Sequence, residues 1–139
     1  MSQVLMLPKK NNLQITPHFN SNEFDCPCSY CNHTLIHPDL PKFLELMRHI
    51  LGSKLSITSA YRCPEYQKQL TFKGYETAKG ISQHNLGNAV DVTNGVSLGT
   101  ELEDAAKEAG FMSIGVGKNW IHVDLRMDKE RRWYYNKKR

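Results

Sequence analysis

The segment 82–91 contains side chains of the kinds that bind metal ions in proteins. It places an imidazole at His84 and a carboxylate at Asp91, separated by a glycine turn and the start of a strand. Val90 and Val92 point to the core in this predicted strand, so Asp91 must lie on its opposite face. Burying a carboxylate there costs several kcal/mol unless a cation or hydrogen-bond donors satisfy it. A metal ion would provide this compensation.

A second predicted strand follows the same logic. Residues 120–126 alternate with a period of two, so apolar side chains share one face and the other carries Trp120, His122, Asp124 and Arg126. Two imidazoles and one carboxylate suit Zn²⁺, and three protein ligands leave the fourth position for water, as in catalytic zinc sites. Zinc lowers the pKa of bound water to about 7, which makes it a nucleophile at neutral pH. The residues therefore favour one catalytic zinc ion bound by His84, Asp91 and His122.

Three motifs in the chain resemble those of a known family. They are Ser-x-His-x-x-Gly-x-Ala-x-Asp at 82–91, Trp-Ile-His-Val-Asp at 120–124 and Thr-Ser-Ala-Tyr-Arg at 58–62. Together they resemble the M15 family of zinc D-Ala-D-Ala carboxypeptidases and L,D-endopeptidases, which share a fold with the hedgehog signalling domain. The likeness runs from about Thr16 to Arg126, and the cysteine cluster at 24–31 is similar to that of viral and prophage members.

The resemblance implies a role for each matched residue. It implies His84, Asp91 and His122 as the zinc ligands, and Arg62 as the cation that binds the substrate carbonyl or carboxylate. Ser82 would line the substrate site. Arginine suits its role because the planar guanidinium donates two hydrogen bonds to one carboxylate or stabilises an oxyanion. Arg62 is thus a candidate for both catalysis and substrate binding.

The chain departs from the family pattern at Asn119. Many relatives have Glu or Asp there, three residues before the last ligand, as a general base, and an amide cannot accept a proton at neutral pH. Asp124 is our candidate for the missing base, because it shares a predicted strand face with His122. Orienting the His122 ring, or pairing with a neighbouring basic side chain, are the alternatives. Trp120 is a candidate for the cleft wall, with packing as its alternative role.

The cysteines raise the question of a second metal site. The chain contains four of them, Cys26, Cys28, Cys31 and Cys63. Cys28 and Cys31 have the spacing of a zinc knuckle, and Cys26 together with Cys63, His33 or His37 would complete a structural site. The alternatives are buried or partly exposed thiols, and oxidised pairs are the least favoured because no secretion signal is recognisable.

Periodicity predicts the elements that position these residues. Apolar spacing predicts helices over 43–51, ended by Gly52, and over 65–72. Thr100 and Glu103 form a capping box that predicts the start of a helix ending at Gly110. A strand ends at Arg62, and a hairpin pairs 113–116 with 120–126. Residues 25–41 are expected as an irregular loop, and 74–80 as a flexible loop or flap.

This element order favours an α+β domain with a small, mainly antiparallel sheet covered by helices, like the hedgehog/DD-peptidase fold. We expect an extended lead-in over 1–15, one zinc peptidase domain over 16–128 and a basic, aromatic tail over 129–139. A net charge of +4 is too mild for a specific nucleic-acid reader. No stretch approaches the roughly 20 apolar residues of a membrane span. The tail would either bind an acidic polymer or phage virion proteins, or pack back on the domain.

These observations and the resemblance predict zinc-dependent hydrolysis of peptide bonds in bacterial peptidoglycan, in stem or cross-bridge peptides. The expected setting is a bacteriophage or prophage endolysin, or a virion-associated peptidase. Without a signal peptide, we expect synthesis in the cytoplasm and action on the cell wall after release or as part of a virion. Two alternatives stay open. One is a hedgehog-like zinc-binding module without turnover, which Asn119 motivates, and the other is a phage structural or assembly component.

Overall fold

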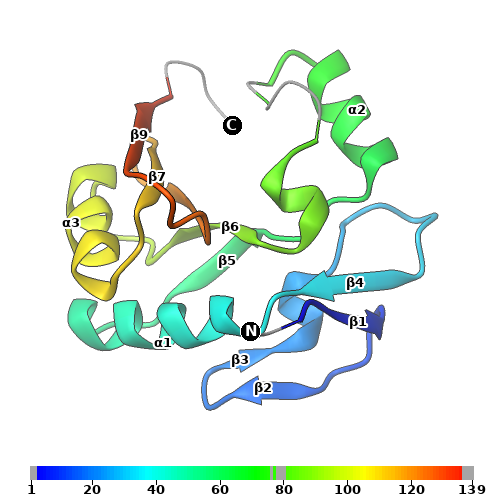
Figure 1. Ribbon diagram of the computed structural model, residues 1–139, viewed down its shortest axis with the longest axis horizontal. Coiled ribbons are helices and arrows are strands. Elements are labelled where there is room, and N and C mark those ends of the chain that lie inside the picture. The colour runs from blue at the N-terminus through cyan, green and yellow to red at the C-terminus, as the bar shows by residue number, and fades with distance from the viewer. Residues whose placement is uncertain (1–2, 76, 78–80, 136–139) are drawn as a thin grey trace.

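The computed structural model describes residues 3–75, 77 and 81–135 (Figure 1). Its α-helices are α1 (Asp39–Leu51), α2 (Pro64–Phe72) and α3 (Gly99–Ala109), and its short 3-10 helices are η1 (Ser21–Phe24) and η2 (Gln83–Leu86). Its strands are β1 (Leu5–Pro8), β2 (Gln14–Thr16), β3 (Phe19–Asn20), β4 (His33–Ile36), β5 (Ser56–Ser59), β6 (Ala89–Thr93), β7 (Ser113–Val116), β8 (Ile121–Asp124) and β9 (Arg131–Tyr134).

The main sheet of the described chain has five strands in the order β5-β6-β8-β7-β9, and the pairs β1-β4 and β2-β3 form two smaller sheets. Neighbouring strands of the main sheet run antiparallel except β7 and β9, which are parallel. The expected α+β class with a mainly antiparallel sheet is therefore confirmed, with one parallel edge strand added. No helix in the described part of the chain is long and apolar enough to cross a membrane.

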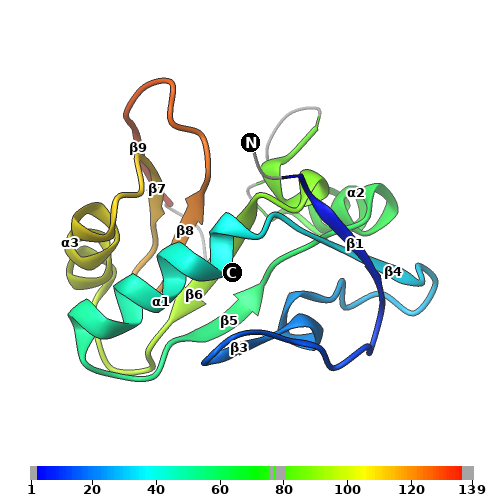
Figure 2. The same cartoon turned by 60° about the horizontal axis from the view of Figure 1, so that its bottom comes forward.

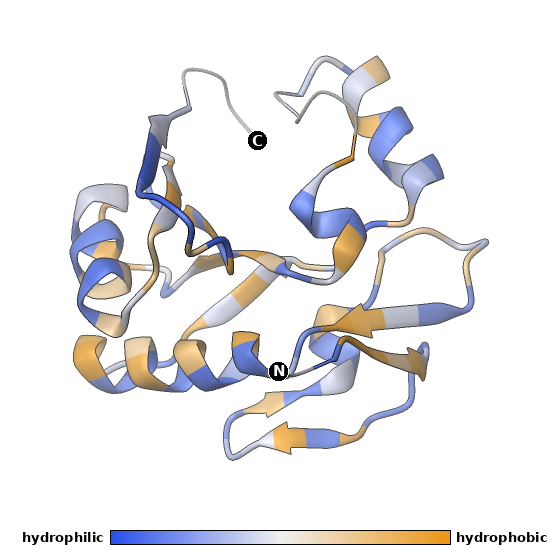
Figure 3. Cartoon of the chain, viewed as in Figure 1, coloured by the Kyte–Doolittle hydropathy of each residue, from blue (hydrophilic) through white to orange (hydrophobic). Residues whose placement is uncertain are grey.

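Helices α1 and α3 lie side by side against one face of the main sheet (Figures 1 and 2). Both carry hydrophobic and hydrophilic residues, as helices with one buried face do (Figure 3). The buried core between helices and sheet includes Leu44, Leu102, Val90, Val92 and Ile121. Because strand side chains alternate, this core leaves the opposite face of β6 and β8 to polar residues.

Two of the predicted helices are confirmed, and the predicted start of the third is wrong. Helix α1 ends at a left-handed Gly52, and α2 covers the region expected to be helical. Helix α3 begins at Gly99, where the Glu101 carboxylate accepts a hydrogen bond from the backbone N–H of Leu98 at 2.8 Å. Glu103 instead pairs with Arg132 of β9 at 3.1 Å, a tertiary contact that replaces the predicted capping box.

Residues 25–41 are not wholly irregular, because β4 lies within them. Strand β4 pairs antiparallel with β1, from the segment expected as an extended lead-in. The segment 1–15 also contains most of β2, and Leu7 packs against the main core. Composition could not show this pairing because the partner strand is distant in the chain. The domain limits at residues 16 and 128 remain a prediction.

The C-terminal part of the sheet combines a predicted hairpin with an unexpected strand. Strands β7 and β8 pair as the sequence predicts. Residues 131–134 of the expected tail form β9, parallel to β7, and residues 136–139 lie outside the described chain. The sequence did not predict this strand, because its basic residues were interpreted as part of a tail. Most of the stretch 74–80, expected as a flexible loop or flap, also lies outside the described residues.

Candidate metal centre

Three buried side chains from β6, β8 and η2 meet on the polar side of the main sheet. Asp91 stands directly opposite His122 in the β6-β8 register, and the turn after η2 brings His84 alongside both. The Oδ1 of Asp91 lies 3.2 Å from Nε2 of His84 and 3.2 Å from Nδ1 of His122. The two ring nitrogens are also 3.2 Å apart. The structure thus brings together the three residues expected as metal ligands.

These three atoms fit a single tetrahedral cation. Zinc bonds to N and O of about 2.0–2.1 Å imply ligand atoms about 3.3–3.4 Å apart in a tetrahedral site. Their measured separations of 3.2 Å are close to this edge length. At most 6% of each residue is exposed, so solvent cannot compensate the charge of Asp91. The donor set of two imidazoles and one carboxylate also matches zinc.

Each histidine is oriented by a second hydrogen bond on its other ring nitrogen. The Nδ1 of His84 lies 2.6 Å from the carbonyl oxygen of Ala60. The Nε2 of His122 lies 2.8 Å from Oδ2 of Asp124. Because both oxygens can only accept, these two nitrogens carry the protons. Nε2 of His84 and Nδ1 of His122 therefore present lone pairs to the metal position.

The electrostatics favour a neutral His84 and an anionic Asp91. Burial lowers the pKa of His84 to about 4, so its ring is neutral at neutral pH. Burial opposes ionisation of Asp91, but His84 and His122 hold the pKa of its carboxyl well below the usual range. Burial also opposes charging of His122, but the Asp124 and Asp91 carboxylates raise its pKa. The site therefore favours positive charge beside Asp91, as a metal position requires.

Arg62 contacts the ligand carboxylate directly. Its Nη2 donates to Oδ2 of Asp91 at 3.0 Å, its Nε donates to Ser59 Oγ at 3.0 Å, and its Nη1 donates to Gln67 Oε1 at 3.2 Å. Only 2% of Arg62 is exposed. The guanidinium thus fixes one oxygen of Asp91 and leaves the other facing the histidines.

Asp124 is fully buried behind His122. Besides the imidazole, its carboxylate accepts hydrogen bonds from Nε and Nη2 of Arg126 at 2.9 and 3.0 Å and from Ser113 Oγ at 2.9 Å. Burial opposes ionisation, but the His122 and Arg126 partners lower the pKa of Asp124. Its position suits orienting the His122 ring and pairing with Arg126, the two alternatives that the sequence left open.

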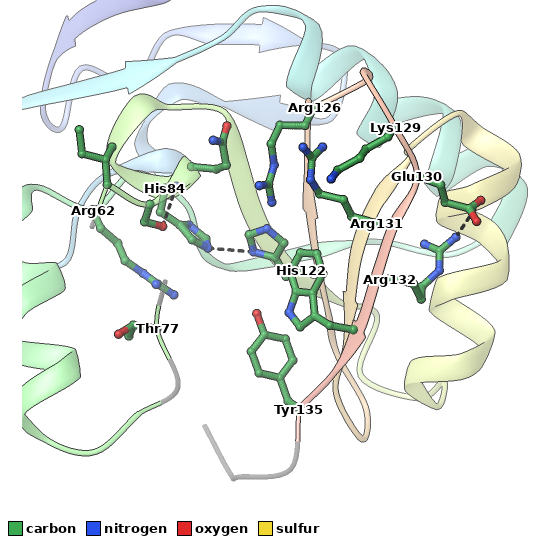
Figure 4. A pocket seen from close by; sticks show the side chains of 14 residues that line it. Arg62, Thr77, His84, His122, Arg126, Lys129, Glu130, Arg131, Arg132 and Tyr135 are labelled. Carbon is green, nitrogen blue, oxygen red and sulfur yellow. Dashed lines mark hydrogen bonds and ion pairs between the residues drawn. The ribbon is translucent and has the colours of Figure 1, made fainter. Parts of the chain in front are cut away.

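A cavity of about 680 Å³ opens beside the two imidazoles (Figure 4). In the figure the rings of His84 and His122 point toward one another, with Arg62 beside His84. Ser82 also lines this cavity, and its hydroxyl accepts a hydrogen bond from the His84 N–H at 3.1 Å, which caps η2. A basic wall faces them, formed by Arg126, Lys129, Arg131 and Arg132.

A second cavity of about 430 Å³ lies on the other side of Arg62, which lines both. Asp91, Asn119 and Trp120 line this second cavity, so the two predicted positions around residue 120 face away from the larger one. Trp120 stacks on Tyr135 with ring centroids 4.7 Å apart. Trp120 therefore both packs and forms a cavity wall.

Sequence reasoning missed three residues of this centre, Gln67, Arg126 and Trp133. Arg126 shares the strand face of His122 and Asp124, a signal that period-two alternation carried. Trp133 lies in β9 with its ring centroid 5.2 Å from that of His122. Its place depends on Gly115, because a Cβ at that glycine would meet the indole at 2.5 Å. Nothing in the sequence pairs Gln67 with Arg62.

The four cysteines form a second cluster, whose metal-ligating atoms lie within 4.8 Å of one another.

Among known proteins, comparison with family profiles matches residues 17–124 to Peptidase M15. Comparisons with curated proteins and with solved structures gave no significant match. The profile covers most of the 139 residues and includes all three ligands of the metal centre. The chain therefore belongs to the M15 family of peptidases.

Proposed function

We propose that this protein hydrolyses peptide bonds in the stem or cross-bridge peptides of bacterial peptidoglycan, as a zinc-dependent peptidase. The family supports a zinc peptidase acting on peptidoglycan-related substrates. One observation carries the proposal for this chain. The three ligand atoms of His84, Asp91 and His122 lie 3.2 Å from one another at a site bordered by substrate-sized cavities.

Zinc bound by these residues would polarise the scissile carbonyl and activate water for attack. The chain's own groups hold the ligands in the required state. The Ala60 carbonyl and the Asp124 carboxylate keep the ring protons on the outer nitrogens of His84 and His122. Arg62 binds the outer oxygen of Asp91. Each ligand is thus oriented before substrate arrives, which favours transition-state stabilisation without reorganisation.

Arg62 lies between the two cavities and is our candidate for stabilising negative charge on the substrate. Among the described residues, Arg62 is the arginine that lines both cavities. Its hydrogen bonds to Ser59 and Gln67 fix the plane of the guanidinium. The attraction between this fixed cation and the scissile oxygen would increase as negative charge develops on that oxygen. The basic wall around Lys129 would attract the carboxylates of acidic stem peptides.

The proposed setting is a bacteriophage or prophage endolysin, or a virion-associated murein peptidase. This setting rests on the resemblance of the cysteine-containing segment to viral and prophage members. The protein would be made in the cytoplasm and reach the wall after release or within a virion. Carboxypeptidase and endopeptidase action both fit a centre with a cavity on each side of Arg62.

One observation favours a second candidate function, a zinc-binding module without turnover. Among the described residues that line the larger cavity, Glu130 is the carboxylate, and Figure 4 shows it turned away from His122 toward Arg132. Asp124 is sealed behind His122, and position 119 is an amide. A peptidase without a carboxylate base at the cavity must use another proton acceptor or lack turnover.

Digestion of purified peptidoglycan separates these two functions. The protein is loaded with zinc and incubated with walls of different cross-bridge types, and the muropeptides are analysed by mass spectrometry. A peptidase releases new amino groups, His84→Ala abolishes the release, and His49→Ala on the exposed side of α1 does not. Stoichiometric bound zinc without release of new amino groups from any wall would establish the binding module and exclude the peptidase.

The third reading, a virion structural or assembly component, needs a different test. Removing residues 129–139 would also remove β9, which carries Trp133 beside His122. The deletion should therefore begin after Tyr135. Lost virion incorporation with intact peptidase activity would support docking through the C-terminal residues, and unchanged incorporation would exclude it.

A further inference from the structure

We propose that Cys26, Cys28, Cys31 and Cys63 bind a second, structural zinc ion, separate from the metal centre in the cavity. The site joins the loop after η1 to the residue that follows Arg62. It does not depend on the peptidase function, because it would exist equally in a protein without turnover. Its role is to fix the backbone from which Arg62 reaches Asp91.

The sulfur positions are close to those of a tetrathiolate zinc site. Zinc–sulfur bonds of about 2.3 Å place the sulfur atoms of a tetrahedral site about 3.8 Å apart. The Sγ atoms of Cys26 and Cys63 are 3.8 Å apart, those of Cys28 and Cys63 3.7 Å, and those of Cys28 and Cys31 3.2 Å. All four lie within 4.8 Å of one another. These distances exceed a disulfide bond of about 2.05 Å, so the sulfur atoms are not cross-linked as pairs.

N–H hydrogen-bond donors contact three of the four sulfur atoms. The backbone N–H of Cys31 donates to Cys28 Sγ at 3.4 Å, and that of Cys63 donates to Cys26 Sγ at 3.4 Å. Lys9, just after β1, places Nζ 3.5 Å from Cys31 Sγ and 3.8 Å from Cys28 Sγ. Four thiolates around Zn²⁺ carry a net charge of about −2, which N–H donors and an ammonium partly balance.

The site is closed to further ligands, unlike the centre in the cavity. Cys26 and Cys63 are buried, and Cys28 and Cys31 are half-buried. Tyr61, Leu35 and Tyr66 pack against the cluster. Four sulfur ligands and an apolar shell are typical of structural zinc, whereas three ligands beside a cavity are typical of catalytic zinc. The two clusters therefore call for the same metal in two different roles.

The link to Arg62 follows from the position of Cys63. Cys63 directly follows Arg62 and is the N-cap of α2, which carries Gln67. The Arg62 carbonyl accepts a hydrogen bond from the Asn85 side chain at 2.7 Å. The backbone N–H of Arg62 donates to the His84 carbonyl at 3.2 Å. A metal on Cys63 would anchor this backbone from the other side, so the guanidinium and its Gln67 partner keep their places.

Metal analysis of the intact chain tests the proposal. Wild type purified without chelator should contain two zinc ions, and the double variant His84→Ala/His122→Ala should keep one. Cys31→Ser should lose the cysteine zinc and keep the other, whereas Cys31→His, which can still ligate, should keep both. Ser29→Ala, in the same loop and exposed, is the matched control and should keep both. If the cavity centre binds no zinc, wild type contains one zinc ion and Cys31→Ser contains none. If the cysteines bind no zinc, wild type and Cys31→Ser contain the same amount. The failure of the cavity site and the failure of the cysteine site are therefore distinguishable.

Native mass spectrometry of wild type avoids any folding defect of the variants. Two zinc ions with four thiols, one zinc being released in step with a thiol reagent, would support the site. A chain mass lowered by the loss of the thiol hydrogens would show disulfide bonds and overturn the proposal. Four thiols that react without releasing zinc would also overturn it. Bound iron in place of zinc would overturn the assignment of the metal. Where peptidase activity is present, loss of the cysteine zinc should lower kcat about 10²-fold through displacement of Arg62, with the cavity zinc retained.

Discussion

Asp124 binds His122 through the ring nitrogen that points away from the metal position. Its Oδ2 lies 2.8 Å from Nε2, whereas Nδ1 of the same ring faces Asp91 Oδ1 at 3.2 Å. The strand alternation that puts both residues on one face of β8 thus places the carboxylate behind the imidazole and outside the cavity. Of the roles that the sequence left for Asp124, this relationship favours orienting the His122 ring.

The substitution Asp124→Asn should therefore weaken metal binding more than it impairs catalysis. Loss of the carboxylate behind a ligand imidazole typically lowers metal affinity about 10–100-fold. Zinc titration of metal-free protein measures this change, with Asp104→Asn on the exposed side of α3 as control. Activity should return at saturating zinc. Activity that stays absent when the site is filled would instead make Asp124 the general base.

The substitution Arg62→Lys should lower turnover while the cavity zinc remains bound. Lysine keeps a positive charge beside Asp91 but cannot hold Ser59 and Gln67 at the same time, because all its N–H donors are on one nitrogen atom. Loss of a fixed donor to a developing oxyanion costs about 10²–10³-fold in kcat. Steady-state kinetics and zinc content check this, with Arg48→Lys of α1 as control. Loss of zinc in parallel with activity would confine Arg62 to holding Asp91.

Gly87 should tolerate no side chain, since it joins η2 to β6. It has a φ of 77°, and a Cβ there would lie 2.7 Å from the backbone of Leu35 in β4. We expect Gly87→Ala to lower the free energy of unfolding by about 2–5 kcal/mol, from backbone strain together with overpacking. Gly95 has a similar φ of 82° but open space around it.

Gly95→Ala is the matched control, because it contributes backbone strain alone. Its expected loss is about 1–2 kcal/mol. Urea unfolding of both variants at saturating zinc isolates the clash with β4 as the difference between them. Equal losses in the two variants would contradict the close packing of the η2 turn on β4.

The hydrogen bonds of Glu45 to His18 and Thr16 should make stability depend on pH. Partial burial opposes ionisation, but hydrogen bonds from His18 and Thr16 lower the pKa of the Glu45 carboxyl. Its oxygens lie 2.7 Å from His18 Nδ1, from the His18 N–H and from the Thr16 hydroxyl. These bonds attach the β2-β3 hairpin to α1. We expect them to contribute about 1 kcal/mol, after allowance for solvent screening.

The sign follows from the depressed pKa. The contribution is complete above the pKa of about 4.3 of an unfolded glutamate, and it disappears as pH falls through the lower folded value. Glu45→Gln should therefore be less stable than wild type at neutral pH and equally stable at the acid end. Chemical unfolding at several pH values measures this, with Glu108→Gln on the exposed side of α3 as control. A difference that persists in acid would exclude the ionised Glu45 carboxylate as its cause.

Lys129 should contribute to substrate attraction rather than to the chemical step. It is exposed on the basic wall of the larger cavity, and Figure 4 shows it on the same side as Arg126 and Arg131. Surface charge contributions of up to about 1 kcal/mol predict that Lys129→Gln raises KM by up to about fivefold at low salt. The effect should vanish at high ionic strength, and kcat should not change. Lys107→Gln on α3 should alter neither constant, and an effect of Lys129→Gln on kcat would place this residue in catalysis.

Local pattern could predict much of the fold and the metal ligands. Alternation in β6 and β8 placed Asp91 and His122 opposite the core, because strand geometry forces side chains to alternate. Helical spacing predicted α1 and α2, and the structure confirms both. The start of α3 was predicted wrongly, since Glu103 is bound by Arg132 from a distant strand. Local signals therefore held wherever no distant partner competed for the same side chain.

By itself the sequence determined which residues can bind metal, which face of each strand they occupy and which family the motifs resemble. These properties depend on side-chain chemistry and on backbone periodicity over a few residues. Only the tertiary structure decided that Arg62 binds Asp91, that Asp124 lies behind His122 and that Trp133 of β9 contacts His122. It also gathered Cys63 with three cysteines more than 30 residues earlier. Such contacts join residues far apart in the chain, and their distances are set by the packing of the whole sheet, which no local pattern encodes.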